Sequence, residues 1–273
     1  MHTGNRTIGF IGSGNMANAL IKGLINSGLY GSDRIMASDL DPAKLKEVSE
    51  QYALKTHLSN RDLIQGCRTI LIAVKPQVIR EVLEEVKQEI RDDHLIISIA
   101  AGIPIKMIHS IISRDIPIIR VMPNTPALIQ KGVSALAPGK EATSDHMAIA
   151  QGIFKAVGKT VVVTEEMMDA VTALSGSGPG FIFRIMECFA DAGERLGFDR
   201  ETALLLVIQT FLGTVNLSDE SELSLSKLRE MVTSPGGTTE AGLKYFKDNG
   251  LENIIYGAVE TACDRSIELG KDD

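Results

Sequence analysis

The fold is decided by residues 7–17, TIGFIGSGNMA, near the start of the chain. The apolar run TIGFIG predicts a buried strand, and it leads directly into GSGNMA, which has the spacing Gly-x-Gly-x-x-Ala. Apolar residues at helical spacing follow (Met16, Leu20 and Leu24), and Gly28 ends that run. A strand, a glycine turn and a helix in this order are typical of a dinucleotide-binding βα unit.

Each small residue of this turn has a physical reason. Gly12 permits a tight turn, Gly14 lets the backbone approach a pyrophosphate, and Ala17 permits close packing of the helix on the strand. The free N–H groups at the helix N-terminus favour an anion. A glycine turn in an unrelated βα unit is the alternative, but the strand before it and the helix after it favour cofactor binding.

Outward from this turn, short apolar runs alternate with segments of helical periodicity as far as about Val163. The nearly continuous runs 70–74 and 95–99 predict strands that helices cover on both faces. This rhythm predicts an α/β fold with a Rossmann-type, doubly wound parallel sheet. The expected strands lie in TIGFIG, RIMASD, TILIAVK, LIISIAA, PIIRVMPN and KTVVV.

The pattern changes after Glu165, where only helical spacing continues. We therefore expect a dinucleotide-binding domain over residues 1–164 and an all-helical domain over residues 165–273. The segment 199–217 is apolar on more than one face, which fits either a helix covered by a second subunit or a central helix buried within one subunit. The expected helices cover residues 181–197, 199–217, 224–232, 239–246 and 251–269.

Composition narrows the function classes. Of 273 residues, 44% are apolar and 23% are charged, which is typical of a soluble globular protein. The net charge of −7 disfavours a nucleic-acid partner. We find no apolar run of spanning length and no signal segment, so we expect a cytoplasmic chain without a membrane partner. The isolated cysteines and histidines predict no metal site, and the three cysteines are expected to be buried small residues.

The identity of the dinucleotide is left open by the residues after the second strand. Asp39 stands where an acidic residue accepts hydrogen bonds from the adenosine ribose, which favours NAD. Asp39 is also explained as a solvated turn residue or helix cap, and donors to the 2′-phosphate of NADP are near in sequence: Ser38, Lys44, Asn60 and Arg61. Both cofactors therefore remain open.

Three further segments end strands at the same carboxyl edge, where ligands of such sheets bind. Lys75, in AVKP, is either a ligand contact or a solvated lysine before a helix. The small residues Ala100 and Ala101 would leave room for a flat ring. Asn124, in MPNTP, either holds a carboxamide or a water, or forms an ordinary tight turn.

Two glycine-rich bends interrupt the helical half, LSGSGP at 174–179 and TSPGGTT at 233–239. Their N–H groups and hydroxyls are able to bind an anion, and the case is clearest at Ser234 and Thr239, because the following helix dipole favours a carboxylate. A capped helix start explains the same residues equally well.

Taken together, GFIGSGNMA, AVKP, SIAAG, MPNTP, LSGSGP and TSPGGTT, in this order, resemble the pyrroline-5-carboxylate reductase family nearly end to end. The resemblance implies a Rossmann domain and a helical domain that interlocks with its copy in a homodimer, with a decamer of five dimers as a further assembly. It implies the last step of proline biosynthesis, the reduction of a small cyclic imino acid, 1-pyrroline-5-carboxylate, to L-proline with NADPH or NADH.

The resemblance also implies roles for individual residues. Many members carry a small polar residue at Asp39, so this departure predicts that both cofactors are tolerated. Thr239 would reach the ring nitrogen, directly or through a water, and Lys75 is the second candidate catalytic residue. The pyrophosphate and ribose of the cofactor would contact Gly12, Ser13, Gly14, Asn15, Met16, Ser38, Asp39 and Asn60. The nicotinamide would contact Val74, Lys75, Pro76, Ala100, Ala101 and Asn124. The substrate carboxylate would be held by Ser234, Gly237 and Thr238.

Two other functions compete with this one. A β-hydroxyacid dehydrogenase would need a lysine with an asparagine four residues later on a central helix, and Lys247 and Asn249 are misspaced. A catalytically silent paralogue that senses nucleotide would keep the turn but not the chemistry. The sequence does not separate a five-membered from a six-membered cyclic imine.

Overall fold

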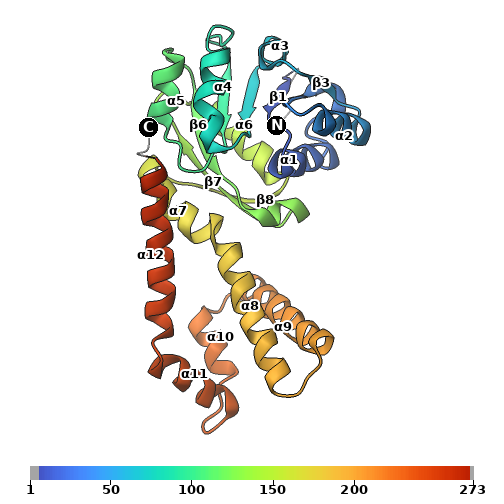
Figure 1. Ribbon diagram of the computed structural model, residues 1–273. Helices are drawn as coiled ribbons and strands as arrows, with labels where there is room; N and C mark the ends of the chain where they lie inside the picture. Colours follow the sequence, from blue (N-terminus) through green and yellow to red (C-terminus); the bar gives the residue numbers. More distant parts are fainter. Residues whose placement is uncertain (1–5, 271–273) are drawn as a thin grey trace. The chain divides into compact units, whose positions relative to one another are not determined.

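The computed structural model describes residues 6–270, whose contacts form two compact units (Figure 1). The first unit runs to Ser177 and resumes at Ala262, and the second covers Gly178–Thr261. Residues just after the boundary expected at 164 pack on the first unit, because Met168 is buried against the sheet residues Ala135 and Ala137.

The first unit is built on an eight-stranded sheet in the order β3-β2-β1-β4-β5-β6-β7-β8. Its first six strands are parallel, and their order 3-2-1-4-5-6 is that of a Rossmann fold, with the switch point between β1 and β4. The doubly wound prediction is confirmed for these strands. They are β1 Ile8–Ile11, β2 Ile35–Ser38, β3 Lys55–His57, β4 Thr69–Ile72, β5 Leu95–Ser98 and β6 Ile118–Met122.

The prediction of a wholly parallel sheet is wrong at β7, Gly132–Pro138, which runs antiparallel to β6 with Met122 opposite Ala135. Only the short helical turn Thr125–Ile129 joins the two strands, so no helix crosses over and the chain reverses. β7 was not expected as a strand because GVSALAP is rich in small residues. The last strand, β8 Gly158–Val162, is parallel to β7.

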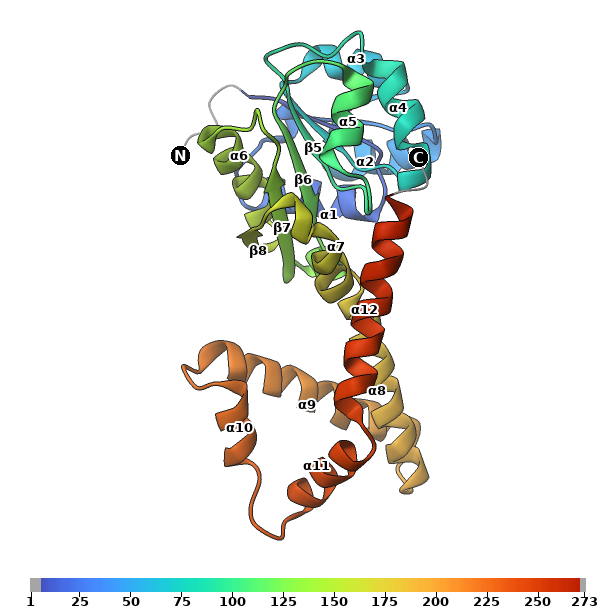
Figure 2. The same cartoon turned by 90° about the vertical axis from the view of Figure 1, so that its left-hand side faces the viewer.

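Helices cover both faces of the sheet (Figures 1 and 2). One core cluster joins the sheet to Leu20 of α1, Val48 of α2 and Phe154 of α6, and the other joins it to Leu63 of α3 and Leu83 of α4. Strand residues alternate between the two clusters, as the two-residue period of a strand requires. The helices are α1 Asn15–Asn26, α2 Pro42–Tyr52, α3 Asn60–Gly66, α4 Ile79–Val86, α5 Ile105–Ile112 and α6 Ser144–Lys155. Short 3₁₀ turns cover Ser32–Arg34, Pro76–Val78 and Glu165–Met167.

A buried ion-pair network anchors the segment after β8 to the sheet. Arg120 of β6 is 4% exposed, and its guanidinium lies 3.0 Å from Glu165 and 3.6 Å from Asp169. Glu165 also accepts a hydrogen bond from the N–H of Ile105, and Ser266 donates to Asp169 over 2.7 Å. These contacts hold α7, Met168–Val171, and the end of α12 on the first unit.

The second unit is all-helical, as expected. Its helices are α8 Gly178–Arg195, α9 Arg200–Glu220, α10 Leu225–Met231, α11 Thr238–Asp248 and the greater part of α12 Leu251–Leu269. Local signals fix the helix starts, since Asp199 accepts from the N–H of Thr202 and Ser224 accepts from that of Lys227. The expected burial of all three cysteines holds at Cys67 but is wrong at Cys188 on α8, which is exposed, and at Cys263 on α12, which is half-buried.

Helix α9 is not buried within the chain. Leu205 is 67% exposed and Leu212 is 52% exposed, so the interpretation of α9 as a central helix of one subunit is wrong. Among the described residues, α9 is the one helix that is long and apolar enough to cross a membrane, judged by length and composition only. Of the two explanations considered for the apolar faces of α9, the one that remains is a helix covered by a surface outside this chain.

Candidate functional site

The glycine turn after β1 has the geometry of an anion-binding loop. Gly12 has a φ of +95°, and a Cβ there would lie 2.7 Å from the carbonyl oxygen of Ala73, so only glycine fits. A Cβ on Gly14 would meet nothing within 4 Å, and Gly14 begins α1 without a side-chain cap. The first N–H groups of α1 therefore have no intrahelical partner and face open space beside Gly14.

Two residues hold the turn in this shape. Ala17 is 1% exposed, which brings α1 close to the sheet. Asn18 donates from its amide to the carbonyl oxygens of Ser13, at 2.8 Å, and Gly14, at 3.3 Å. The sequence reasoning missed Asn18, although Asn side chains are known to hydrogen-bond backbone groups a few residues earlier in the chain. Asn15 and Met16, the other residues expected at this turn, form the first residues of α1.

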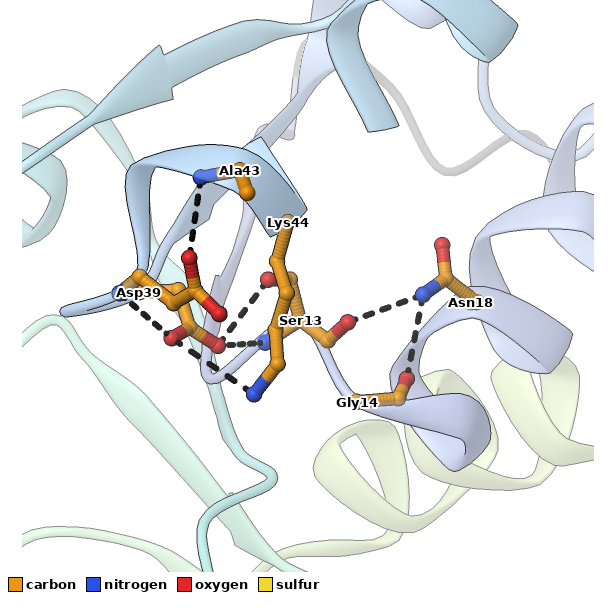
Figure 3. Close-up of polar contacts among 7 residues, drawn as sticks. Ser13, Gly14, Asn18, Asp39, Ala43 and Lys44 are labelled. Atoms are coloured by element: carbon orange, nitrogen blue, oxygen red, sulfur yellow. Dashed lines mark hydrogen bonds and ion pairs between the residues drawn. The ribbon is translucent and has the colours of Figure 1, made fainter. Parts of the chain in front are cut away.

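Asp39, at the end of β2, is locked onto the same turn (Figure 3). One carboxylate oxygen accepts from both the N–H of Ser13, at 2.9 Å, and its hydroxyl, at 3.0 Å. The other oxygen accepts from the N–H of Asp41 and lies 4.0 Å from the Lys44 ammonium. Burial by itself would raise the pKa of Asp39, but the hydrogen bonds of Ser13 and Asp41 and the charge of Lys44 together hold this pKa below its usual range. Asp39 is therefore an ionised acceptor.

Ser38 and Asn60 form a buried polar chain next to Asp39. The Ser38 hydroxyl donates to the Asn60 amide oxygen over 2.7 Å, and the Asn60 amide nitrogen donates to the Glu85 carboxylate over 2.8 Å. Glu85 lies on α4, and sequence reasoning missed it because a contact over 25 residues leaves no local pattern. Arg61 donates to the carbonyl oxygen of the same Glu85.

The other expected contacts end strands at the same carboxyl edge. Val74, Lys75 and Pro76 follow β4, and Lys75 is exposed. Ala100, which follows β5, is buried, and Ala101 after it is half-buried. Asn124, after β6, accepts from the N–H of Val133 over 2.9 Å, which fixes the start of β7 and uses its amide oxygen. The structure thus brings all the expected cofactor-binding residues to one edge of one sheet.

The bend before α11, in the second unit, is a separate anion-binding geometry. Gly236 has a φ of +71°, and a Cβ on Gly237 would lie 2.4 Å from the Ser234 hydroxyl. Gly237 begins α11 without a side-chain cap, so the N–H groups of Thr238 and Thr239 lack intrahelical partners. Ser234 and Thr238 are exposed and Thr239 is half-buried, and none of these hydroxyls has a hydrogen-bond partner within residues 6–270.

Glu240 completes this bend and was missed from the sequence. Its carboxylate accepts from the N–H of Gly236 over 2.7 Å, which closes the loop from its C-terminal side. A glutamate at the third helical position is a recognised signal for such backward capping.

The segment LSGSGP, whose N–H groups and hydroxyls were expected to be able to bind an anion, is helical over most of its length. Residues Thr172–Gly176 form a π-helical turn, closed by the N–H of Ser177 on the carbonyl oxygen of Thr172 at 2.8 Å. The hydroxyl of Ser175 donates to the carbonyl oxygen of Val171 and is not free for a ligand. A Cβ on Gly176 would lie 2.4 Å from the Met122 Cε, so this glycine serves close packing of the turn against β6.

Comparisons with known proteins cover nearly the whole chain. A family model described as pyrroline-5-carboxylate reductase dimerisation matches residues 165–269, and one described as NADP oxidoreductase coenzyme F420-dependent matches residues 7–102. The pyrroline-5-carboxylate reductase of Methanosarcina acetivorans is 40% identical over 98% of this chain and 99% of its own length, and that of Pseudomonas aeruginosa is 38% identical over 97% of each.

Solved structures agree with these relatives. A pyrroline-5-carboxylate reductase from Coxiella burnetii superposes with a TM-score of 0.92 at 37% identity, covering 97% of this chain and 98% of that one. The Plasmodium falciparum pyrroline carboxylate reductase, solved with NADP bound, gives a TM-score of 0.88 at 30% identity and covers 99% of each chain.

Proposed function

The chain belongs to the pyrroline-5-carboxylate reductase family, and on this premise we propose that it reduces the C=N bond of 1-pyrroline-5-carboxylate to give L-proline, the last step of proline biosynthesis. The observation that carries the proposal is the similarity to curated reductases at 40% identity over 98% of the chain. Hydroxyacid oxidation and silent nucleotide sensing are not favoured by any of these relatives.

The first unit fits a nicotinamide dinucleotide. The open space beside Gly14 and the uncapped N-terminus of α1 would take the pyrophosphate, because the backbone there is bare and the helix dipole favours an anion. Asn15 and Met16 would border the same phosphate groups. When bound, the reduced cofactor supplies the hydride, and the protein supplies its placement.

The nicotinamide end would lie along the later strand ends. Val74, Pro76, Ala100 and Ala101 offer small or apolar surfaces for a flat ring. The Asn124 amide nitrogen remains a donor for a carboxamide, since only its oxygen is engaged. Lys75 is exposed at this edge, and its ammonium would favour the negative charges of cofactor and substrate.

The bend before α11 would hold the substrate. The free N–H groups at Thr238 and Thr239 and the Ser234 hydroxyl would bind the carboxylate, with Gly237 leaving room for its approach. The Thr239 hydroxyl would lie near the imine nitrogen, where it would donate a proton itself or position a water that donates it. A threonine hydroxyl is a weak acid, so catalysis would depend mainly on positioning.

The dimerisation domain and the exposed apolar side chains of α9 support a homodimer. A second copy would cover this surface, since isolated soluble chains rarely leave so much apolar area exposed. The proposal extends to a decamer of five such dimers in the cytoplasm, and scattering and fractionation measurements test both points.

Substrate turnover tests the assignment. The purified chain should oxidise NADH or NADPH when 1-pyrroline-5-carboxylate is added, and should not reduce nicotinamide with β-hydroxyacids. Thr239→Ala should lower kcat/KM for the imine by about ten- to a hundredfold while the Kd for cofactor changes little, because the hydroxyl acts only at the substrate.

Thr261→Ala, an exposed threonine outside the bend, is the matched control. Wild-type levels of kcat/KM in Thr239→Ala would contradict the role of this hydroxyl. Nucleotide binding without turnover on any cyclic imine would contradict the proposed reaction.

A further inference from the structure

The four side chains expected from the sequence as donors to a 2′-phosphate each have a neighbour in the structure. Ser38 is fully buried and donates to Asn60, and Asn60 donates to the carboxylate of Glu85. Arg61 donates to the carbonyl oxygen of Glu85 and lies 3.7 Å from the Glu89 carboxylate. The ammonium of Lys44 lies beside Asp39 itself. Ser38 and Asn60 are thus engaged by acceptors, and the charges of Arg61 and Lys44 are each partly offset by a neighbouring carboxylate.

We propose that Asp39 is the specificity-determining residue of the ribose subsite and that it makes the chain favour NADH over NADPH. The inference rests on the proposed function, because it presupposes that a nicotinamide dinucleotide lies along the glycine turn. It concerns only the ribose 2′ position, where the two cofactors differ.

The geometry around Asp39 favours a hydroxyl over a phosphate. Two hydrogen bonds from Ser13 fix the carboxylate against the pyrophosphate loop, and the side chain is only 14% exposed. A carboxylate accepts a hydrogen bond from a ribose hydroxyl, whereas a phosphate offers it no donor and adds a second negative charge. Because the carboxylate is held in place by Ser13, it is not free to turn away from that charge.

The surrounding charges do not reverse this preference. The Asn60 amide donates to the carboxylate of Glu85, and Arg61 lies 3.7 Å from the carboxylate of Glu89, so both donors already have a negative neighbour. Lys44 is half-exposed and 4.0 Å from Asp39, and it would offset part of the repulsion. Because this ammonium would be shared between Asp39 and the phosphate, NADPH would still bind, although more weakly than NADH.

Binding measurements test the inference directly. The chain has no tryptophan, so the fluorescence of the reduced nicotinamide reports binding without tryptophan background. We expect a Kd for NADH at least about tenfold lower than that for NADPH, because juxtaposed like charges weaken the wrong ligand. Adenosine 2′,5′-bisphosphate should likewise compete less well than AMP, from which it differs only by the 2′-phosphate. Equal affinities, or tighter NADPH binding, would overturn the inference while leaving the proposed function standing.

Substitutions of Asp39 test the effect of its carboxylate on cofactor preference. Asp39→Ser should tighten NADPH binding by about tenfold or more and change NADH binding by only a few fold. Asp41→Ser is the matched control, because it removes a negative charge two residues away and serine still caps α2; its NADH to NADPH ratio should stay that of the unmodified chain. Asp39→Asn, which keeps an acceptor for Ser13, should shift the ratio in the same direction if Asp39→Ser fails to fold.

An unchanged ratio in both folded Asp39 variants would overturn the inference. Failure of the unmodified chain to bind either dinucleotide would instead contradict the proposed function, so the two outcomes are distinguishable.

Discussion

The two compact units differ in how completely they bury their own apolar residues. In the first unit, strands β1, β2, β4 and β5 are buried along their whole length, and two core clusters fill the faces of the sheet. In the second unit, Ala190 and Ala203 are the only fully buried residues among 178–261, while large side chains such as Phe183 and Ile254 are more than half exposed. The first unit is therefore complete by itself, and the second needs another surface.

The largest expected effect comes from placing a charge on the exposed apolar surface of α9. Leu205→Asp should abolish the dimer and lower activity by at least about a hundredfold, because a carboxylate would be buried without a partner when the copies meet. Sedimentation velocity and imine turnover measure both effects.

Ile129→Asp is the control, since Ile129 is 73% exposed on the first unit. This variant should keep the assembly of the unmodified chain. A Leu205→Asp protein that sediments as a dimer would show that α9 is not the surface that a second copy covers.

The sequence predicted the strands and helices whose patterns are strong. Continuous Ile, Leu and Val runs marked β4 and β5, the apolar run before the glycine turn marked β1, and helical spacing of apolar residues marked the helices of the second unit. Strand β7 was missed because its small residues carry little strand signal, and its direction depends on the length of the connection from β6.

The candidate site was predictable where a short motif encodes the geometry. Gly12 is glycine because its φ is positive and a backbone neighbour lies close, whereas Gly14 leaves open space where a ligand could approach. Both properties are expected of a dinucleotide-binding turn. Glu85 could not be found, because its contact with Asn60 exists only after the chain has folded. The π-helical turn in LSGSGP was not predicted, because small residues of this kind are also typical of a loop.

A lower pH should destabilise the first unit more than the second, because all five histidines precede residue 178. His94 is fully buried and accepts from the N–H of Arg91; burial, with the charge of Arg91, lowers the pKa of His94 to about 4. The unfolded chain takes up this proton near its ordinary pKa of about 6.5. Stability is therefore full above that pH and falls as the pH drops toward 4, by about 2 kcal/mol at about pH 5.

Urea unfolding at neutral and acidic pH, with hydrogen exchange in β5 to locate the loss, measures this effect. His94→Asn keeps an acceptor for the N–H of Arg91 and should flatten the acid slope, while the exposed His109→Asn should not. If exchange protection at acidic pH were lost in α8 and α9 instead of in the sheet, the expected difference between the two units would be contradicted.

The smallest expected effect concerns the packing inside the second unit. Phe189 of α8 and Phe211 of α9 meet edge to face, with ring centroids 5.6 Å apart and an interplanar angle of 82°. Since Phe189 is still 47% exposed, Phe211→Leu should lower the free energy of unfolding by only about 1 kcal/mol, and a double-mutant cycle with Phe189→Leu measures the pair itself. Phe183→Leu, at an exposed position on α8, should cost less. A cost of about 3 kcal/mol or more for Phe211→Leu would equal that of truncating a closed core, and the second unit would then be better packed than its exposed surface indicates.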